Sequence, residues 1–383
     1  MDTAFPYSNY VTGKHFVGRR NDVTLLGNLL SQGEHVVISA PPKTGKTSLV
    51  QQTLFSMRMA GNAFIVGQFS AQNIRTAQDF LLRLGSTLLR MVATTPEEFA
   101  AVTAQYLDGT HFVFDPVAYS EKGQVLSLDW DFDKADVEAL LRFPFALAQD
   151  RAERLFLIVD EFQCLSLLDN PDEVFRPLDA SLREAPRLGR FSYILCGSGV
   201  NAMKAIFNTS LLFHRQVNHV QLSPVDEKEV ADHVHKGFLT GGKVVDKDLL
   251  QGACRLFRGH LWYINHFAYL CDSMTRGYIL EPVLIDALNC LIAVHEPRFQ
   301  AVMNDLTTFQ VNLLRATVDG VTRFSAAEVI RRYGLHSSAN VKRVKDALMK
   351  KEVLEFDEND IPTIIDPLFE YWVKKYYFEV TQA

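Results

Sequence analysis

The stretch Ser39–Val50, which reads SAPPKTGKTSLV, is the part of the sequence from which the fold can be predicted. It contains Gly45-Lys46-Thr47, the end of a phosphate-binding loop, although Ala40 stands where such a loop usually opens with glycine. The apolar residues before Ala40 predict a strand, and Lys46–Met57 predict a helix. A loop between a strand and a helix can bind phosphate through its backbone N–H groups and the helix N-terminus.

The individual residues of this loop differ in how easily they can be replaced. Alanine at position 40 costs little unless the backbone there needs a positive φ, whereas Gly45 lets the backbone approach a phosphate group closely. Lys46 is expected to reach the β- and γ-phosphates of ATP, and the Thr47 hydroxyl is expected to hold Mg²⁺. An ordinary tight turn followed by a surface lysine is the alternative. The expected nucleotide-binding residues of the loop are Pro41, Pro42, Lys43, Thr44, Gly45, Lys46, Thr47 and Ser48.

A second motif, Leu155–Glu161 (LFLIVDE), places two carboxylates at the end of an apolar run. The run predicts a buried strand, with Asp160 at its C-terminal edge beside the phosphate loop. Asp160 can then help to hold Mg²⁺, and Glu161 can orient or deprotonate the attacking water. An apolar run that ends in charge is a weak signal alone, but it becomes strong when a phosphate loop precedes it. The second carboxylate distinguishes a hydrolase from a protein that only binds nucleotide.

The composition sets limits on partners and compartment. Of 383 residues, 48% are hydrophobic and 22% are charged, which is ordinary for a globular protein. The net charge of −6 provides no global attraction for nucleic acid or an anionic membrane. The five cysteines lack CxxC spacing and are expected to be reduced thiols in the cytoplasm. The first residues have no signal-peptide pattern and no apolar run is long enough to span a bilayer, so we expect no membrane association.

From about residue 14 to 223, short β-rich apolar runs alternate with helix-length segments, which is typical of buried parallel strands. The fold class predicted for this part is therefore α/β, a parallel sheet flanked by helices. Residues 97–132 fit the alternation poorly, and we expect them to form an insertion of mixed structure. The runs are His35–Ile38, Ala63–Val66, Leu155–Val159 and Phe191–Leu195.

The rest of the chain is predicted to be helical and to end in a winged helix. Helical periodicity runs from Asp226 to about Met303. Beyond Phe309, three short helices precede a predicted hairpin, FDENDIPTIID, and residues 337–340 (SSAN) supply cap residues for the third helix. We therefore expect an ATPase domain over residues 1–223, a helical lid domain over 224–304 and a winged-helix domain over 305–383.

Nearly the whole chain resembles the archaeal-type ATPase family, in the AAA+/STAND branch of the P-loop NTPases. Residues 5–23 (FPYSNYVTGKHFVGRRNDV) look like the family's N-terminal segment, with Asp22 where glutamate is usual. Residues 191–203 (FSYILCGSGVNAM) look like its fourth strand and the following turn. The resemblance implies that Ser198 is the polar sensor beside the γ-phosphate; a turn residue that satisfies its own backbone is the alternative. It also implies that the adenine side of the nucleotide is lined by Phe16, Val17, Gly18 and Arg19.

Two further features follow from this resemblance. Arg215 precedes the apolar run Val217–Leu222, where related ATPases carry an arginine that acts in trans on a neighbour's nucleotide; a surface arginine in a salt bridge is the alternative. Residues 257–263 (FRGHLWY) align with the family's G-x-P element, which reports the nucleotide state to the lid. Leu261 replaces the proline, so we expect this element to be less rigid than in the family.

The winged helix carries the prediction about partners. Between Arg323 and Glu352 there are eight basic and three acidic residues. Lys342, Arg343 and Lys345 lie on the predicted third helix, which a winged helix offers to the DNA major groove. The alternative is a winged helix that binds protein. The closing segment IIDPLFEYWVKKYY resembles the family's D-P-x-F-x-x-W ending, and its aromatic residues are expected to pack the wing onto the body.

Two functions are therefore kept open. In the first, the chain hydrolyses ATP with Mg²⁺, its nucleotide state moves the winged helix, and the winged helix acts on DNA. In the second, the chain is a slow STAND-type nucleotide switch or scaffold whose winged helix binds a protein partner. A homo-oligomer that forms with nucleotide would suit a trans-acting Arg215.

Overall fold

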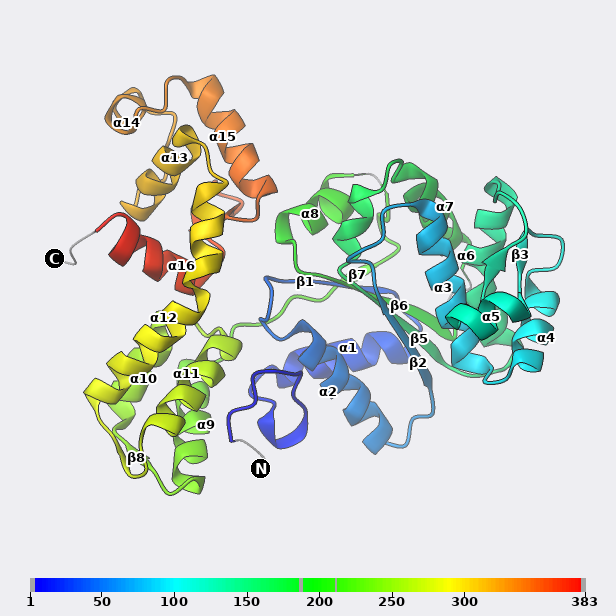
Figure 1. The fold of residues 1–383 in the computed structure, drawn as a ribbon, viewed down its shortest axis with the longest axis horizontal. Helices are drawn as coiled ribbons and strands as arrows, with labels where there is room; N and C mark the ends of the chain where they lie inside the picture. Colours follow the sequence, from blue (N-terminus) through cyan, green and yellow to red (C-terminus); the bar gives the residue numbers. More distant parts are fainter. Residues whose placement is uncertain (1–3, 186–188, 211, 380–383) are drawn as a thin grey trace. The chain divides into compact units, whose positions relative to one another are not determined.

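The computed structural model describes residues 4–185, 189–210 and 212–379, which form two compact units (Figure 1). The sheet unit consists of Arg20–Ala40 and Gln52–Leu222. The lid–wing unit consists of Met1–Arg19, Pro41–Gln51 and Ser223–Ala383. Each unit has its own cluster of buried apolar side chains, so each is described by itself.

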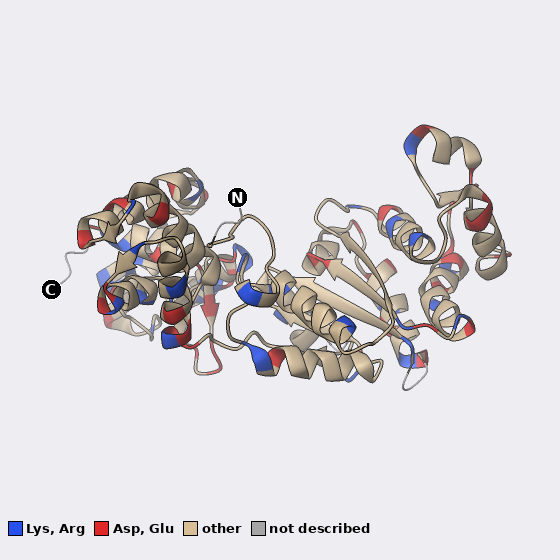
Figure 2. Cartoon of the chain, turned by 90° about the horizontal axis from the view of Figure 1, so that it is seen from below, with Lys and Arg blue, Asp and Glu red and all other residues tan. Residues whose placement is uncertain are grey.

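The sheet unit is built on one five-stranded sheet with the strand order β2-β5-β6-β1-β7. All of its strand pairs are parallel, as predicted for an α/β fold. Asp160 is the only charged residue in these strands, and Figure 2 shows them almost free of charge. The strands are β1 (Val36–Ser39), β2 (Ile65–Ser70), β5 (Leu155–Asp160), β6 (Phe191–Gly197) and β7 (Asn218–His219).

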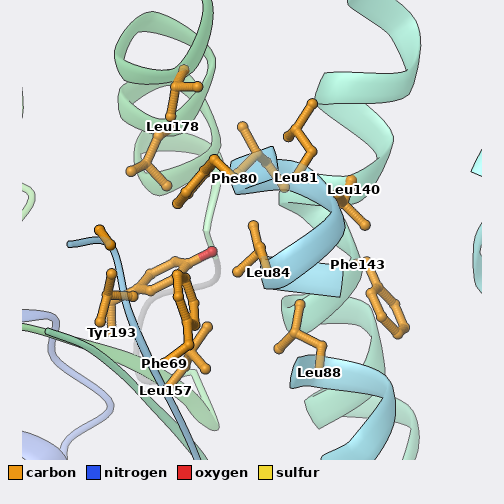
Figure 3. Close-up of a cluster of buried hydrophobic side chains, with 14 of the residues drawn as sticks. Phe69, Phe80, Leu81, Leu84, Leu88, Leu140, Phe143, Leu157, Leu178 and Tyr193 are labelled. Carbon is orange, nitrogen blue, oxygen red and sulfur yellow. The ribbon is translucent and has the colours of Figure 1, made fainter. Parts of the chain in front are cut away.

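Helices cover both faces of this sheet (Figure 1). On β5, Leu155, Leu157 and Val159 point to one face because successive side chains of a strand alternate. There they join a buried cluster with α3 (Ala77–Val92), α6 (Lys134–Asp150) and α7 (Asp172–Glu184). Figure 3 shows this cluster, with Tyr193 of β6 directed toward it. The opposite face is covered by α1 (Arg20–Ser31) and the C-terminal part of α2 (Lys46–Met59).

Residues 97–132, interpreted above as an insertion, contain both helices and strands. Two short helices alternate with the strands of one antiparallel pair. Leu126 packs closely on α3, where a Cβ added at Gly85 would meet its side chain. The elements are α4 (Pro96–Tyr106), β3 (Phe112–Val113), α5 (Pro116–Lys122) and β4 (Ser127–Leu128).

A buried histidine lies beside the first strand of the sheet. His35 is 7% exposed, and its Nδ1 accepts a hydrogen bond of 3.1 Å from the backbone N–H of Tyr193. An imidazole can accept this bond only when Nδ1 carries no proton. Burial lowers the pKa of His35 from 6.5 to about 4. The neutral ring is therefore part of the native core.

We expect His35 to make the sheet unit sensitive to acid. In the unfolded chain the imidazole takes up a proton below pH 6.5, but in the folded chain it does so only near pH 4. The contribution of the neutral His35 ring to the free energy of unfolding is therefore complete above pH 6.5. This contribution is lost as the pH falls toward 4. The difference corresponds to about 3 kcal/mol. Urea unfolding at pH 7.5 and pH 4.5 measures it.

His35→Asn keeps a hydrogen-bond acceptor but cannot titrate, so it should lose less stability between the two pH values than the wild type. His214→Asn, at an exposed position, is the matched control and should behave like the wild type. An equal loss of stability in the wild type and in His35→Asn would contradict the prediction.

The lid–wing unit contains the predicted helical part and the predicted winged helix. The helical part comprises α9 (Glu227–Thr240), α10 (Lys247–Leu256), α11 (Leu261–Met274) and α12 (Glu281–Asn304). A short parallel pair, β8 (Val244–Val245) and β9 (Tyr278–Ile279), links them. The winged helix comprises α13 (Thr308–Val318), α14 (Ala327–Tyr333), α15 (Ser338–Lys350), and the hairpin β10 (Leu354–Phe356) and β11 (Pro362–Ile364).

Two predicted details of the winged helix are present. Ser337 caps α15, because its hydroxyl accepts the backbone N–H of Asn340 at 3.2 Å. In α16 (Pro367–Trp372), Phe369 and Trp372 are buried. Their rings lie 5.6 and 5.7 Å from the ring of Phe299 on α12. The closing aromatic residues thus pack the winged helix onto the lid helices. None of the described helices is long and apolar enough to cross a membrane.

Candidate nucleotide-binding and hydrolysis site

The backbone of the predicted phosphate loop explains which of its residues can vary. Lys43 and Gly45 have φ values of 61° and 103°, in the left-handed region. Glycine suits this φ at position 45, and the missing Cβ also leaves space for Nη1 of Arg19, which would lie 2.9 Å from it. Ala40 is absent from the residues with positive φ, so alanine fits where glycine is usual.

The side chains of the loop gather around one of its own carbonyl groups. Lys46 is 7% exposed, and its Nζ donates to the carbonyl oxygen of Pro41 at 3.0 Å. The hydroxyl of Thr44 donates to the same oxygen at 2.7 Å. Thr47 follows Lys46 in the first turn of α2, and Ser48 Oγ accepts the backbone N–H of Val11 at 3.1 Å. An ammonium group, hydroxyls and a helix N-terminus form a donor set that fits the phosphates of a nucleotide.

The structure brings the N-terminal segment to this loop through Arg19. Its Nη1 donates to the carbonyl oxygen of Thr44 at 2.7 Å, and its Nε donates to that of Ser223 at 2.9 Å. Gly18, with a φ of 67°, leaves no room for a Cβ, which would lie 2.7 Å from Val225. Val17 is buried and Phe16 is half-buried. The four residues expected on the adenine side thus form one segment that Arg19 connects to the loop.

Two contacts of the loop with the lid were not predicted from the sequence. Lys43 Nζ lies 3.5 Å from the ring centroid of Trp262, close enough for a cation–π interaction. Burial, and then the nearby charge of Arg298, lower the pKa of Lys43. His260 Nε2 donates to the carbonyl oxygen of Pro42 at 3.2 Å. Burial lowers the pKa of His260 to about 4, so the ring is neutral at pH 7.

The element that resembles G-x-P therefore touches the loop although its proline is missing. Leu261 is the first residue of α11, a position that proline also favours but that other residues can occupy. His260 precedes it as the N-cap, and its Nδ1 accepts the backbone N–H of Tyr263 at 3.5 Å. The start of this helix is thus determined by His260 rather than by a proline.

A polar network continues from this helix to the winged helix. The hydroxyl of Tyr263 donates to the Asp366 carboxylate at 2.8 Å, and Arg298 Nη2 lies 2.8 Å from the same oxygen. Although burial raises the pKa of Asp366, the charge of Arg298 and several hydrogen bonds hold it below its usual value. Asp366 is also the N-cap of α16, where it accepts the N–H groups of Leu368 and Phe369.

At the edge of the sheet, the structure brings Glu161 and Ser198 together. β5 ends at Asp160, whose Oδ1 accepts the backbone N–H of Glu161 at 3.0 Å. Ser198 follows β6 and donates its hydroxyl to Glu161 Oε2 at 2.6 Å. Its hydroxyl therefore bonds to another side chain, whereas a simple turn residue would bond to its own backbone. The parallel order places the carboxyl ends of β1 and β5 on one edge, with β6 between them.

Arg215 lies on an exposed turn of the sheet unit. Its φ is 62°, and neighbouring Phe213 has a φ of 63° and is 1% exposed. The N–H of Phe213 donates to Asp179 Oδ1 at 2.7 Å, which anchors the turn. Within residues 4–185, 189–210 and 212–379, no hydrogen bond or ion pair to the Arg215 guanidinium is found. Arg215 therefore forms no surface salt bridge with any of these residues, which was the alternative to a role in trans.

The basic residues of the winged helix are partly engaged with its own hairpin. Lys342 and Arg343 of α15 are exposed. Lys345 is different, because its Nζ lies 2.5 Å from Asp360 Oδ1 and 4.2 Å from the ring centroid of Phe356. The wing adds four acidic residues, so residues 323–364 contain eight basic and seven acidic side chains. The local positive charge is therefore smaller than the helices alone indicate.

Among the described residues, one cluster of possible metal ligands joins the insertion to the start of α6. His111, Asp133 and Asp136 have ligand atoms within 4.8 Å of one another. His111 Nδ1 lies 2.8 Å from Asp136 Oδ2, which also accepts the N–H of Asp133 at 2.7 Å. Asp133 in turn caps α6. These bonds within the cluster account for its geometry without a metal ion.

Comparison with known proteins agrees with the fold. The model of a family described as "Probable winged helix domain" matches residues 297–375. No curated protein matches the sequence. The Walker-type ATPase PABY2304 of Pyrococcus abyssi is 14% identical, with a TM-score of 0.68 over 97% of this chain and 100% of that one. The Aeropyrum pernix ORC2 protein, solved in complexes with ADPNP and ADP, is 16% identical, with a TM-score of 0.59 over 95% and 93%.

At these identities the likeness establishes the fold alone. The predicted resemblance to P-loop ATPases that end in a winged helix is confirmed at this level. The chain thus has a P-loop ATPase fold, in which a parallel sheet precedes helical elements and a C-terminal winged helix.

Proposed function

We propose that this chain hydrolyses ATP with Mg²⁺ and that its nucleotide state moves the winged helix. The observation that carries the proposal is the pair Asp160–Glu161 at the carboxyl end of β5, in the same sheet whose β1 leads into the loop. A protein that only binds nucleotide has no need of a second carboxylate that a neighbouring strand holds in place. Phosphate release from ATP, measured with Mg²⁺ and with a chelator, tests the proposal. No release above background in either condition would overturn it.

The residues take the following parts in this proposal. Magnesium ATP, when bound, supplies the scissile phosphoryl bond and a cation that neutralises its charge. Lys46 leaves the carbonyl oxygen of Pro41 and binds the phosphates, while residues 41–48 surround them with backbone N–H groups. Thr47 and Asp160 supply oxygen ligands for Mg²⁺, and Glu161 accepts a proton from water. Phe16, Val17, Gly18 and Arg19 form the adenine side.

Arg215 is proposed to act on the nucleotide of a second copy. Its guanidinium has no partner among the described residues, and its turn is held by a buried phenylalanine and a carboxylate. A guanidinium on an anchored turn can stabilise the negative charge that develops on a phosphoryl group during hydrolysis. The mass of the particle in solution, with and without a non-hydrolysable ATP analogue, tests this part. A monomer in both states would remove Arg215 from the mechanism.

We assign residues 1–223 to nucleotide hydrolysis, 224–304 to a lid and 305–383 to a winged helix that responds to the nucleotide. The support lies within the lid–wing unit. Pro42 and Lys43 of the loop touch His260 and Trp262, and the next residue of α11, Tyr263, binds Asp366 of the winged helix. A change at the loop therefore has a continuous set of contacts to α16.

Asp366→Asn is expected to uncouple the winged helix from the nucleotide. Asparagine caps a helix as well as aspartate does, so α16 should stay intact. The amide lacks the negative charge that holds Arg298 and Tyr263, so the link to α11 should weaken. Hydrogen exchange of the α16 amides, with and without a non-hydrolysable ATP analogue, measures the coupling.

The wild type should show nucleotide-dependent exchange in α16, and Asp366→Asn should lose most of this dependence while it keeps its affinity for the analogue. Asp305→Asn is the control, because that side chain is 73% exposed and pairs with Lys351 at the surface. An unchanged response in Asp366→Asn would contradict the coupling.

For the partner of the winged helix, DNA is the first candidate. Lys342 and Arg343 are exposed on α15, the helix that a winged helix places in the major groove. The double variant Lys342→Ala/Arg343→Ala should reduce the slope of log affinity against log salt by about two. Lys345→Ala should leave it unchanged, because this ammonium is already paired with Asp360. Titration of a short duplex at several salt concentrations measures both slopes.

A protein partner is the second candidate, and the acidic wing favours it. Asp357, Glu358 and Asp360 at the hairpin would face DNA phosphates with like charge. In that case the chain is a slow STAND-type switch, and hydrolysis resets its state. No DNA binding at low salt would exclude the first candidate and support this one.

A further inference from the structure

Gln163, which sequence analysis did not single out, reaches back to the carboxylate of Glu161. It lies in the 3₁₀ helix Phe162–Leu167 that directly follows β5. Its Nε2 donates to Glu161 Oε2 at 2.5 Å. We propose that Gln163 is a positioning residue, which together with Ser198 holds Glu161 in the orientation needed for hydrolysis. This inference rests on the proposed function of Glu161.

The geometry leaves one oxygen of Glu161 for water. Gln163 Nε2 and Ser198 Oγ both donate to Oε2, at 2.5 and 2.6 Å, and they lie 3.4 Å from each other. Two donors from different elements fix the side-chain rotation of the carboxylate. Oε1 takes part in none of the hydrogen bonds among the described residues. The carboxylate therefore offers Oε1, in one fixed direction, to the proton of a water molecule.

The surroundings of Gln163 are unfavourable for stability, which indicates a functional reason for this amide. Its Oε1 is buried, and within the described part of the chain it has no hydrogen-bond partner. A buried polar atom without a partner costs free energy that an apolar side chain of the same size would avoid. Glu161 itself has a φ of 53°, which is strained for a residue with a side chain.

A glycine on the neighbouring strand makes room for this arrangement. A Cβ at Gly197 would lie 2.7 Å from Gln163 Oε1 and 2.5 Å from Met203 Cγ. The last position of β6 therefore has no side chain where the amide passes, and Ser198 follows immediately. An unpaired oxygen, a strained backbone and a glycine in close contact with the amide thus lie around one carboxylate. Unfavourable features that gather at one group are expected where a protein keeps a functional geometry.

The test replaces Gln163 by leucine, which has a similar size and no polar atoms. Because a misplaced base loses catalysis rather than binding, kcat for ATP should fall about tenfold while KM stays within about twofold. The midpoint of thermal unfolding should not fall, since the unpaired oxygen is removed. Gln149→Leu, at an exposed position of α6, is the control and should keep the wild-type kcat. A merely structural role would instead lower the unfolding midpoint.

A second comparison uses Glu161→Gln as the background. If Gln163 acts through Glu161, adding Gln163→Leu to this variant should not lower the residual rate further. An additional tenfold loss there, or a wild-type kcat in Gln163→Leu alone, would overturn the inference. If Glu161→Gln itself turned over at the wild-type rate, the proposed function of Glu161 would fail and the inference with it. An inactive Glu161→Gln beside a fully active Gln163→Leu would remove the inference alone.

Discussion

Lys46→Ala is expected to abolish nucleotide binding, with a loss of affinity for ATP of at least about 100-fold. Lys46 is 7% exposed and its ammonium already lies on the loop, where it donates to the Pro41 carbonyl oxygen. It can exchange this neutral acceptor for a charged phosphate oxygen with little movement, and a charge-assisted bond is stronger. Two lysines, Lys43 and Lys46, belong to the nucleotide-binding residues predicted over 41–48. Lys43 is stacked on Trp262, so the alanine substitution removes the other ammonium group. Titration with a fluorescent ATP analogue measures the loss.

The control for this experiment is Lys122→Ala, a lysine in the last turn of α5 that is exposed. It should bind the analogue as the wild type does. Circular dichroism should show that Lys46→Ala remains folded, because the bond from Lys46 to the Pro41 carbonyl oxygen lies within the loop and not between strands of the sheet. Affinity near that of the wild type in Lys46→Ala would contradict the assignment of residues 41–48 to the phosphates.

Glu161→Gln is expected to stop turnover while nucleotide remains bound. Glutamine has nearly the same shape, so Ser198 can still donate to its side-chain oxygen, but it cannot accept a proton from water. Loss of a general base lowers the rate by on the order of 10²- to 10⁴-fold. Because Glu161 is assigned no contact with the nucleotide, affinity for ATP should change little. Phosphate release and analogue binding, measured on the same preparation, separate the two effects.

Glu121→Gln, at an exposed position of α5, serves as the matched change of charge and should leave the rate unaltered. Equal rates of phosphate release in Glu161→Gln and in the wild type would remove Glu161 from the mechanism. A loss of nucleotide affinity in Glu161→Gln would mean that its part is binding rather than proton transfer.

Features that depend on residues close in sequence were predictable. The runs that became β1, β5 and β6 are apolar and β-rich, and such runs indicate buried parallel strands. The loop between β1 and α2 was also predictable, because an apolar run, a loop signal and a helix-length segment follow one another there. The winged helix was also predictable, from three short helices with a cap residue and a hairpin.

Features that depend on residues far apart in sequence were not predictable. Lys43 is separated from Trp262, and Tyr263 from Asp366, by long stretches of chain, and no pattern marks either pair. Gln163 looks like an ordinary residue after a strand until the fold brings Ser198 beside the same carboxylate. The pairing of Lys345 with Asp360 depends on how the hairpin returns to α15, so counting charges on the helices overstated the basic surface.

The most direct test of the account is a single-turnover experiment with the chain in excess over ATP and with Mg²⁺ present. The account predicts that the wild type releases phosphate from every bound ATP, and that Glu161→Gln binds the same amount of ATP but releases it intact on denaturation. It also predicts that a chelator stops release by the wild type, because Thr47 and Asp160 then have no ion to hold. Release at the same rate by the wild type and by Glu161→Gln, or release that is indifferent to Mg²⁺, would contradict the account.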